Sequence, residues 1–149
     1  MKALQYAVEQ LENPYNSLWL FPQGIIKPPN YRPIEFQTGI TYIAQKVIKE
    51  YGGINLLPVS VNYTFLREDR PEVLVEVGEV KTIENADFGR HEFTKQLQED
   101  FEQLCDRQLL NITRGNVEGY EYLFRQKFKW FRKLEKRLKR VGMKDSHSK

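Results

Sequence analysis

Residues 18–24 read LWLFPQG, an apolar run of strand length that stops at a proline and a glycine. The nine residues that follow, IIKPPNYRP, contain three prolines, which fix φ and remove backbone donors. We therefore predict a buried strand that delivers a rigid polar loop to its carboxyl end, where open α/β sheets bind ligands. Gly24 would let a ligand approach the backbone, and Lys27 and Arg32 are cations suited to phosphate. On spacing alone, a strand followed by a stiff surface connector is the simpler interpretation.

Three segments in order strengthen the ligand-binding interpretation. Residues 20–24, LFPQG, resemble the third sequence block, FPEGTR, of the glycerol-3-phosphate and lysophospholipid acyltransferase family. Residues 32–39, RPIEFQTG, resemble the segment that opens the next helix in that family, and residues 57–61, LPVSV, resemble its fourth, proline-containing strand block. Together they cover about the first half of the chain, and three blocks in order are more specific than one.

The resemblance implies that the loop binds the acceptor substrate. The substrate-binding residues that it implies are Phe21, Pro22, Gln23, Gly24, Lys27 and Arg32. The chain has Gln23 where glutamate is usual, and Ile26 where the family has an arginine associated with the acceptor's phosphate. Either Lys27 or Arg32 restores this charge, or the acceptor is a lipid or glycosylated terpenoid without a phosphate at that place.

Length and composition agree with one folded domain. At 149 residues, of which 40% are hydrophobic and 19 aromatic, the chain can bury a real core. It has no apolar run near the roughly 20 residues needed to span a bilayer, and no signal-peptide pattern follows Met1. The single Cys105 excludes an internal disulfide framework. We therefore expect a cytoplasmic protein, peripheral at the inner face of the membrane.

Charge divides the chain into two parts. Residues 1–124 carry 12 basic and 18 acidic side chains, whereas residues 125–149 carry 11 and 2, so the net charges are −6 and +9. We place the partial acyltransferase domain at residues 1–119, and a basic amphipathic helix with a disordered tail at residues 120–149.

Apolar periodicity predicts an α/β fold, a mixed β-sheet flanked by helices and, by the resemblance, a partial glycerolipid acyltransferase-like domain. Helices are expected at residues 2–12, 40–51 and from 92 to about 111, and strands at residues 18–21, 54–65 and 72–77, with the last two forming an antiparallel hairpin. Gly52 and Gly53 would close the second helix. The first helix begins in mid-pattern, so we expect Met1 to be an internal methionine.

Residues 120–141 combine aromatic and leucine side chains at helical spacing with nine lysines and arginines. This composition is typical of helices that lie in a membrane interface and bind anionic lipid. A helix that docks its apolar stripe on its own domain fits the same pattern. Nucleic-acid binding is not expected, because no nucleic-acid motif accompanies the charge.

A catalytic base is missing from the sequence. Acyl transfer to a hydroxyl needs one, and the family that the chain resembles uses a histidine with an aspartate five residues later. His91 has Gln96 at that offset, His147 lies too near the end, and Cys105 has no histidine nearby in sequence. No metal-ligand spacing or phosphate-binding glycine motif is present. We therefore assign no catalytic residue, metal ligand or bound cofactor to this chain.

These features predict the carboxyl-terminal part of an acyltransferase. The whole enzyme would move a fatty acyl group from acyl-CoA or acyl carrier protein to the hydroxyl of a lysophospholipid, glycerol phosphate or related lipid acceptor. The alternative from another class is a noncatalytic peripheral membrane-binding module.

Overall fold

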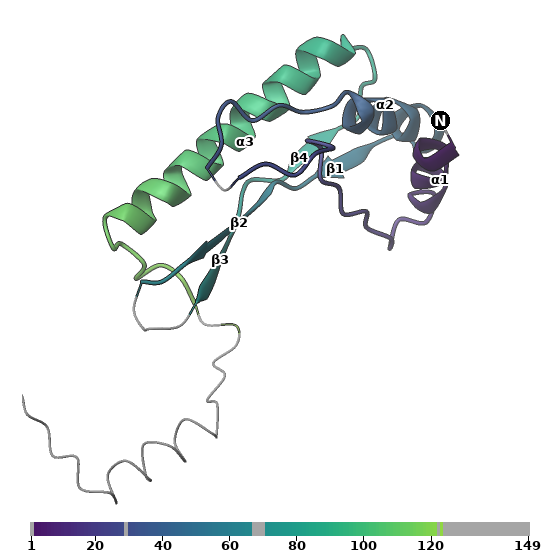
Figure 1. The fold of residues 1–149 in the computed structure, drawn as a ribbon. Helices are drawn as coiled ribbons and strands as arrows, with labels where there is room; N and C mark the ends of the chain where they lie inside the picture. Colours follow the sequence, from purple (N-terminus) through teal and green to yellow (C-terminus); the bar gives the residue numbers. More distant parts are fainter. Residues whose placement is uncertain (1, 29, 67–70, 122, 124–149) are drawn as a thin grey trace, which may run out of the picture. The chain divides into compact units, whose positions relative to one another are not determined.

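The computed structural model describes residues 2–28, 30–66, 71–121 and 123, and the chain divides into two compact units, residues 1–117 and 118–149. The first unit has both helices and strands, so the predicted mixture of α and β structure is confirmed (Figure 1). Its elements are α1 (Lys2–Gln10), α2 (Gly39–Tyr51), β1 (Ile54–Leu56), β2 (Val59–Thr64), β3 (Glu72–Val77), β4 (Lys81–Ile83) and α3 (Arg90–Thr113).

The apolar core lies between α1 and α2. Ala7 and Val8 pack against Ile43 and Val47, a pair of neighbours on one face of α2 because they are four residues apart. The helix α2 ends at Gly52, whose φ of 92° is left-handed and whose N–H donates to the Ile48 carbonyl at 2.9 Å. The predicted glycine end of this helix is therefore confirmed.

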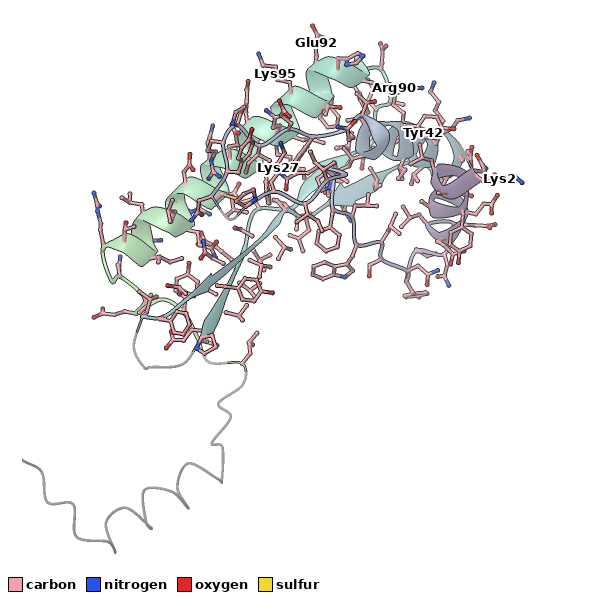
Figure 2. The ribbon with its side chains drawn as sticks, in the orientation of Figure 1. Lys2, Lys27, Tyr42, Arg90, Glu92 and Lys95 are labelled. Atoms are coloured by element: carbon pink, nitrogen blue, oxygen red, sulfur yellow. The ribbon has the colours of Figure 1, made fainter. Side chains whose placement is uncertain are left out.

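Polar contacts join α2 to the amino-terminal end of α3. The hydroxyls of Thr41 and Thr94 lie 2.9 Å apart, and both side chains are buried. Arg90 donates to Gln45 Oε1 at 2.6 Å and stacks over the ring of Tyr42, with Cζ 5.1 Å from the ring centre (Figure 2). This end of α3 is therefore fixed to α2, the helix that follows residues 21–36, which we call the candidate loop.

The strands form one interrupted antiparallel ribbon. β1 pairs with β4 and β2 pairs with β3, which confirms the predicted hairpin. The expected single strand at residues 54–65 is divided at Leu57 and Pro58. On the other side of the ribbon, three residues, 78–80, lie opposite these two. The extra residue bends the ribbon, as a β-bulge does.

The β2–β3 hairpin turns most of its polar side chains inward and its valines outward, which is the opposite of a simple amphipathic sheet. Side chains of Ser60, Leu74 and Glu76 point inward, and Leu74 is 3% exposed. Three directly opposed pairs point outward, and we call them the outer hairpin face: Val59 with Val77, Val61 with Val75, and Tyr63 with Val73. The alternation in the sequence correctly indicates one solvent-facing side, but that side is the apolar one.

Helix α3 covers the inner side of the hairpin with polar contacts. Gln108, which is 1% exposed, accepts from Ser60 Oγ at 2.7 Å and donates to the Leu74 carbonyl at 3.1 Å. Arg107 donates to Glu76 Oε1 at 2.9 Å. Because both strands bond to α3, the helix holds the hairpin in register and in orientation (Figure 1).

The prediction of a strand at residues 18–21 is wrong. This segment has no strand geometry and pairs with no described strand, and the side chains of Trp19 and Phe21 are mostly exposed. An apolar run becomes a strand only where a neighbour accepts its backbone hydrogen bonds. The predicted mixed sheet is likewise replaced by antiparallel pairs alone, as far as the described residues extend.

No helix in the described part of the chain is both long and apolar enough to cross a bilayer. The helix and disordered tail expected after residue 120 fall almost wholly outside the described residues, which include only positions 120, 121 and 123 of that segment.

Gly78 is expected to be intolerant of a side chain. A methyl group there would lie 2.8 Å from Pro58 Cγ and 3.2 Å from Leu104 Cδ2, and overpacking of this kind costs about 1–3 kcal/mol. Gly78→Ala should therefore lower the free energy of unfolding, measured by urea denaturation, by that amount. Gly53→Ala is the matched control, because its methyl group meets the Ile83 carbonyl at 3.5 Å and Glu84 Cγ at 3.6 Å, both ordinary contact distances. Equal stability of the two variants would contradict the tight packing at Gly78.

Candidate functional site

The first half of the candidate loop is a tight turn at residues 21–24. Gly24 donates to the Phe21 carbonyl at 3.2 Å and has a φ of 70°, which favours glycine. The Gln37 N–H donates to the Pro22 carbonyl at 2.7 Å, and a methyl group at Gly24 would lie 3.3 Å from Gln37 Cγ. The turn is thus tied to the residues just before α2.

Apolar side chains stand exposed around this turn. Phe21 is 88% exposed and Ile26 is fully exposed, and Trp19 and Ile25 also face solvent for more than half of their surface. Large apolar side chains grouped on a surface are typical of contact with a ligand, a lipid or another protein. Among the predicted substrate-binding residues, Phe21 therefore offers an apolar contact, while Pro22, Gln23 and Gly24 form the turn beside it.

Lys27 is the cation nearest to this turn in sequence. Its Nζ lies 4.3 Å from the centre of the Tyr31 ring, a cation–π contact that orients the side chain. A second turn, in which Tyr31 donates to the Pro28 carbonyl at 3.1 Å, brings the ring to this place. Lys27 forms no ion pair with any residue of the described ranges, so its charge remains available to an anion.

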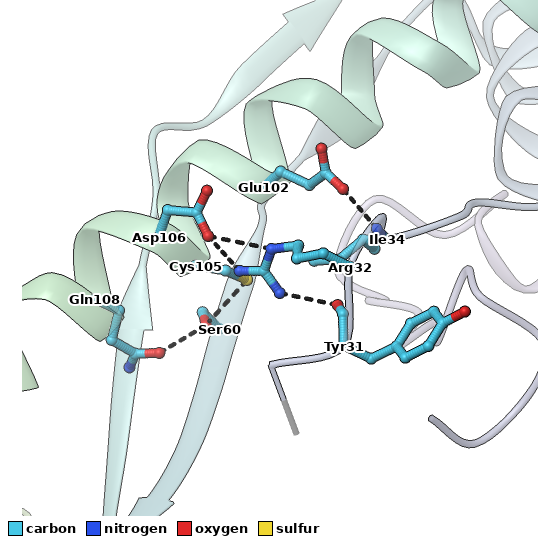
Figure 3. A network of polar contacts seen from close by, with 8 residues as sticks. All are labelled: Tyr31, Arg32, Ile34, Ser60, Glu102, Cys105, Asp106 and Gln108. Carbon is cyan, nitrogen blue, oxygen red and sulfur yellow. Dashed lines mark hydrogen bonds and ion pairs between the residues drawn. The ribbon is translucent and has the colours of Figure 1, made fainter. Parts of the chain in front are cut away.

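Arg32, the second predicted cation, is turned toward α3. Its Nε donates to Asp106 Oδ1 at 3.1 Å, its Nη2 contacts the same oxygen, and its Nη1 donates to the Tyr31 carbonyl at 3.0 Å (Figure 3). The pair is partly exposed, with 31% of the Arg32 side chain and 62% of the Asp106 side chain accessible. A phosphate at Arg32 would have to replace Asp106.

The loop is held along α3 by three side chains that the sequence interpretation missed. Glu102 accepts from the Ile34 N–H at 2.5 Å, Gln98 accepts from the Phe36 N–H at 3.1 Å, and Asp106 binds Arg32. These acceptors are four residues apart and form one row on the helix. Because Ile34 is buried and the Phe36 ring packs on Phe101 with centres 5.5 Å apart, residues 32–36 form a fixed strap. The spacing of four residues between these acceptors is visible in the sequence, but the loop residues that they bind are not.

None of the described residues provides an evident catalytic base. Cys105 Sγ lies 3.4 Å from Ser60 Oγ, and burial raises the pKa of the thiol although the bond to Ser60 opposes this shift, so the group is protonated at neutral pH. His91 is exposed in the first turn of α3, with no carboxylate bonded to it in the described part. No group of three or more metal-ligating side chains gathers among the described residues. The arrangement can bind and orient a ligand, and it lacks the pair needed to deprotonate a hydroxyl.

Comparison of the chain with family models, with curated proteins and with solved structures finds no match in any of the three.

Glu102→Ala is expected to loosen the strap. The substitution leaves the Ile34 N–H without its acceptor, and an unpaired, partly buried donor costs about 1 kcal/mol or more. Hydrogen exchange at the Ile34 amide should therefore become roughly fivefold faster, because 1.4 kcal/mol corresponds to a factor of ten. Gln103→Ala, at an exposed position of the same helix, should leave that rate unchanged. Identical exchange in both variants would show that Glu102 does not hold the strap.

Proposed function

We propose that this chain is the carboxyl-terminal part of an acyltransferase that moves a fatty acyl group from a thioester donor to the hydroxyl of a lysophospholipid, glycerol phosphate or related lipid acceptor. The observation that carries the proposal is the glycine-dependent turn at residues 21–24, which lies within a segment resembling the family's third block. Lys27 follows the turn and exposed apolar side chains surround it. An amphiphilic acceptor has a polar head and an acyl chain, which are the two chemical features that this surface can contact.

The described residues support a binding role in the reaction. Lys27 would bind the negative head group of the acceptor, and Phe21 and Ile26 would contact its acyl chain. In acyl transfer the acceptor hydroxyl attacks the thioester carbonyl, its proton passes to a base, and the donor thiol leaves. We assign the base to a histidine–aspartate pair in a longer chain, with acyl-CoA or acyl carrier protein as donor.

The finer fold assignment belongs to the same proposal. It is supported by the order of the three resembling segments, residues 20–24, 32–39 and 57–61, although the strand expected before the turn does not form. A cytoplasmic enzyme, peripheral at the inner face of the membrane, fits the amphiphilic acceptor.

The acceptor role of Lys27 can be tested in a longer chain that includes coding sequence in frame before Met1. Lys27→Ala should raise the acceptor KM about tenfold and leave kcat nearly unchanged, because a charge-assisted contact contributes about 1.5 kcal/mol to binding. Gly24→Val should abolish turnover, since valine disfavours a φ of 70°. Lys95→Ala, on the exposed side of α3, is the matched control. The assay follows thiol release from an acyl thioester with lysophosphatidate as acceptor.

Two results would contradict this proposal. One is an unchanged KM in the Lys27→Ala enzyme. The other is turnover by the isolated 149-residue chain that His91→Ala abolishes, because the base would then lie within this chain.

The noncatalytic membrane-binding module remains the second candidate function. It is favoured by the exposed Trp19, Phe21 and Ile26 and by the net charge of +9 over residues 125–149. If this function is correct, the protein should sediment with anionic liposomes, and a chain that ends before Tyr120 should not.

Salt separates the two contributions to that binding. The electrostatic part should weaken as salt rises, because the Debye length falls from about 10 Å at 0.1 M to about 3 Å at 1 M. Phe128→Asp with Phe131→Asp should weaken binding at every salt concentration, because the change removes apolar insertion. Full binding by the truncated chain would show that residues 120–149 are not required.

A further inference from the structure

The outer hairpin face is a continuous apolar surface without a charged side chain. It consists of a central pair, Val61 with Val75, between the pairs Val59 with Val77 and Tyr63 with Val73. Five of the six side chains are between 41% and 71% exposed, and the adjoining Phe65 is 69% exposed. The polar and acidic side chains of the same strands point to the other side, where Ser60 and Glu76 contact α3. Water therefore meets the side of the hairpin that should be buried.

We infer that this face binds the same face of a second copy of the chain. The exposed side chains of the outer hairpin face and Phe65 amount to on the order of 600 Å², the upper end of the largest patch on a typical monomer. Two such faces packed together would bury on the order of 1,200 Å², which reaches the lower limit of specific protein–protein interfaces. The inference does not depend on the proposed acyltransferase function.

The absence of charge on this face favours a second copy of the chain over a basic helix or anionic lipid as the partner. A face without carboxylates offers no ion pair to a basic helix, and a face without lysine or arginine offers no ion pair to anionic lipid, which the net −6 of residues 1–124 would also repel. An uncharged apolar face does not repel its own copy. Two antiparallel sheets pack well in this way, with their strands nearly aligned and about 10 Å apart.

The distribution of side-chain size along the face indicates the orientation of the two copies. Tyr63 lies at one end of the hairpin and the valine pair 59 and 77 lies at the other. A twofold axis over the central pair, Val61 and Val75, that reverses the strand direction would place the large end of each copy over the small end of its partner. Large side chains opposite small ones fill such an interface evenly. Residue 75 of one copy then lies close to the axis and to the partner's central pair.

Sedimentation velocity of the full 149-residue chain tests the inference. We expect a monomer–dimer equilibrium across about 1 to 100 µM, because association is concentration-dependent. Val75→Glu should raise the dissociation constant at least 100-fold, since it buries two like charges near the axis. Thr82→Glu, an exposed position in the other part of the ribbon, should leave the constant unchanged. Val75→Thr keeps a β-branched side chain and should weaken the dimer about tenfold, so a folding defect in the glutamate variant would not hide the effect.

A cysteine cross-link tests the orientation. The chain has a single cysteine, so a Cys105→Ser background allows one new thiol at a time. Val75→Cys in this background should cross-link the two copies with a short bismaleimide, because thiols on sheets about 10 Å apart lie near each other at the axis but too far apart for a direct disulfide. Lys95→Cys, on the exposed side of α3, should not.

Other occupants of the face would be recognised by different results, each of which overturns the inference. A chain that stays monomeric at 100 µM and binds neutral phosphatidylcholine liposomes through Val75 would assign the face to lipid. A monomer in which a thiol at position 75 reacts with maleimide only after residues 118–149 are removed would assign it to that segment. A dimer that Val75→Glu does not affect would place the contact on another surface.

Discussion

A single buried amide, Gln108 on α3, determines how the hairpin sits. It binds β2 through Ser60 and β3 through the Leu74 carbonyl, so both strands depend on one side chain. Hydrogen bonds are directional, and a buried amide left without partners would cost about 1–3 kcal/mol. The polar side of the hairpin therefore faces α3, and the valines must face outward. The outer hairpin face is the consequence of satisfying this amide.

Helix α3 consequently carries two structures on separate rows of side chains. Leu104 and Gln108 contact the ribbon, while Gln98, Glu102 and Asp106 hold residues 32–36. Residues four apart form such rows, so one helix can position both the hairpin and the loop. The loop's two ends are fixed by different elements, since the turn at residues 21–24 is tied to Gln37 and the strap is tied to α3. Between them lies the segment that presents Lys27 and the exposed isoleucines.

Local patterns predicted the helices, the hairpin and the glycine end of α2, because each of these depends on residues close in sequence. The i, i+4 spacing of Ile43 and Val47 marks α2, and Gly52 marks its end. The failures concern distant partners. The apolar run at residues 18–21 has the composition of a strand, but no neighbouring strand pairs with it. The alternation around Leu74 indicates a strand, but it does not indicate which face of the strand is buried. Neither the Arg32–Asp106 pair, separated by 74 positions, nor the Ser60–Gln108 contact could be read from local pattern.

The two cations of the candidate loop differ in what holds them, and the magnitudes decide whether that matters for an anionic ligand. An ion pair as exposed as Arg32 with Asp106 contributes only about 0.2–1 kcal/mol, and a phosphate bound at the same exposed place would be screened in the same way. Moving Arg32 from the carboxylate to a phosphate would therefore exchange one weak contact for another and cost little. The strap would stay in place meanwhile, because the Ile34 and Phe36 amides remain bonded to Glu102 and Gln98. Lys27 needs no such exchange, so it would bind the anion first and Arg32 would follow.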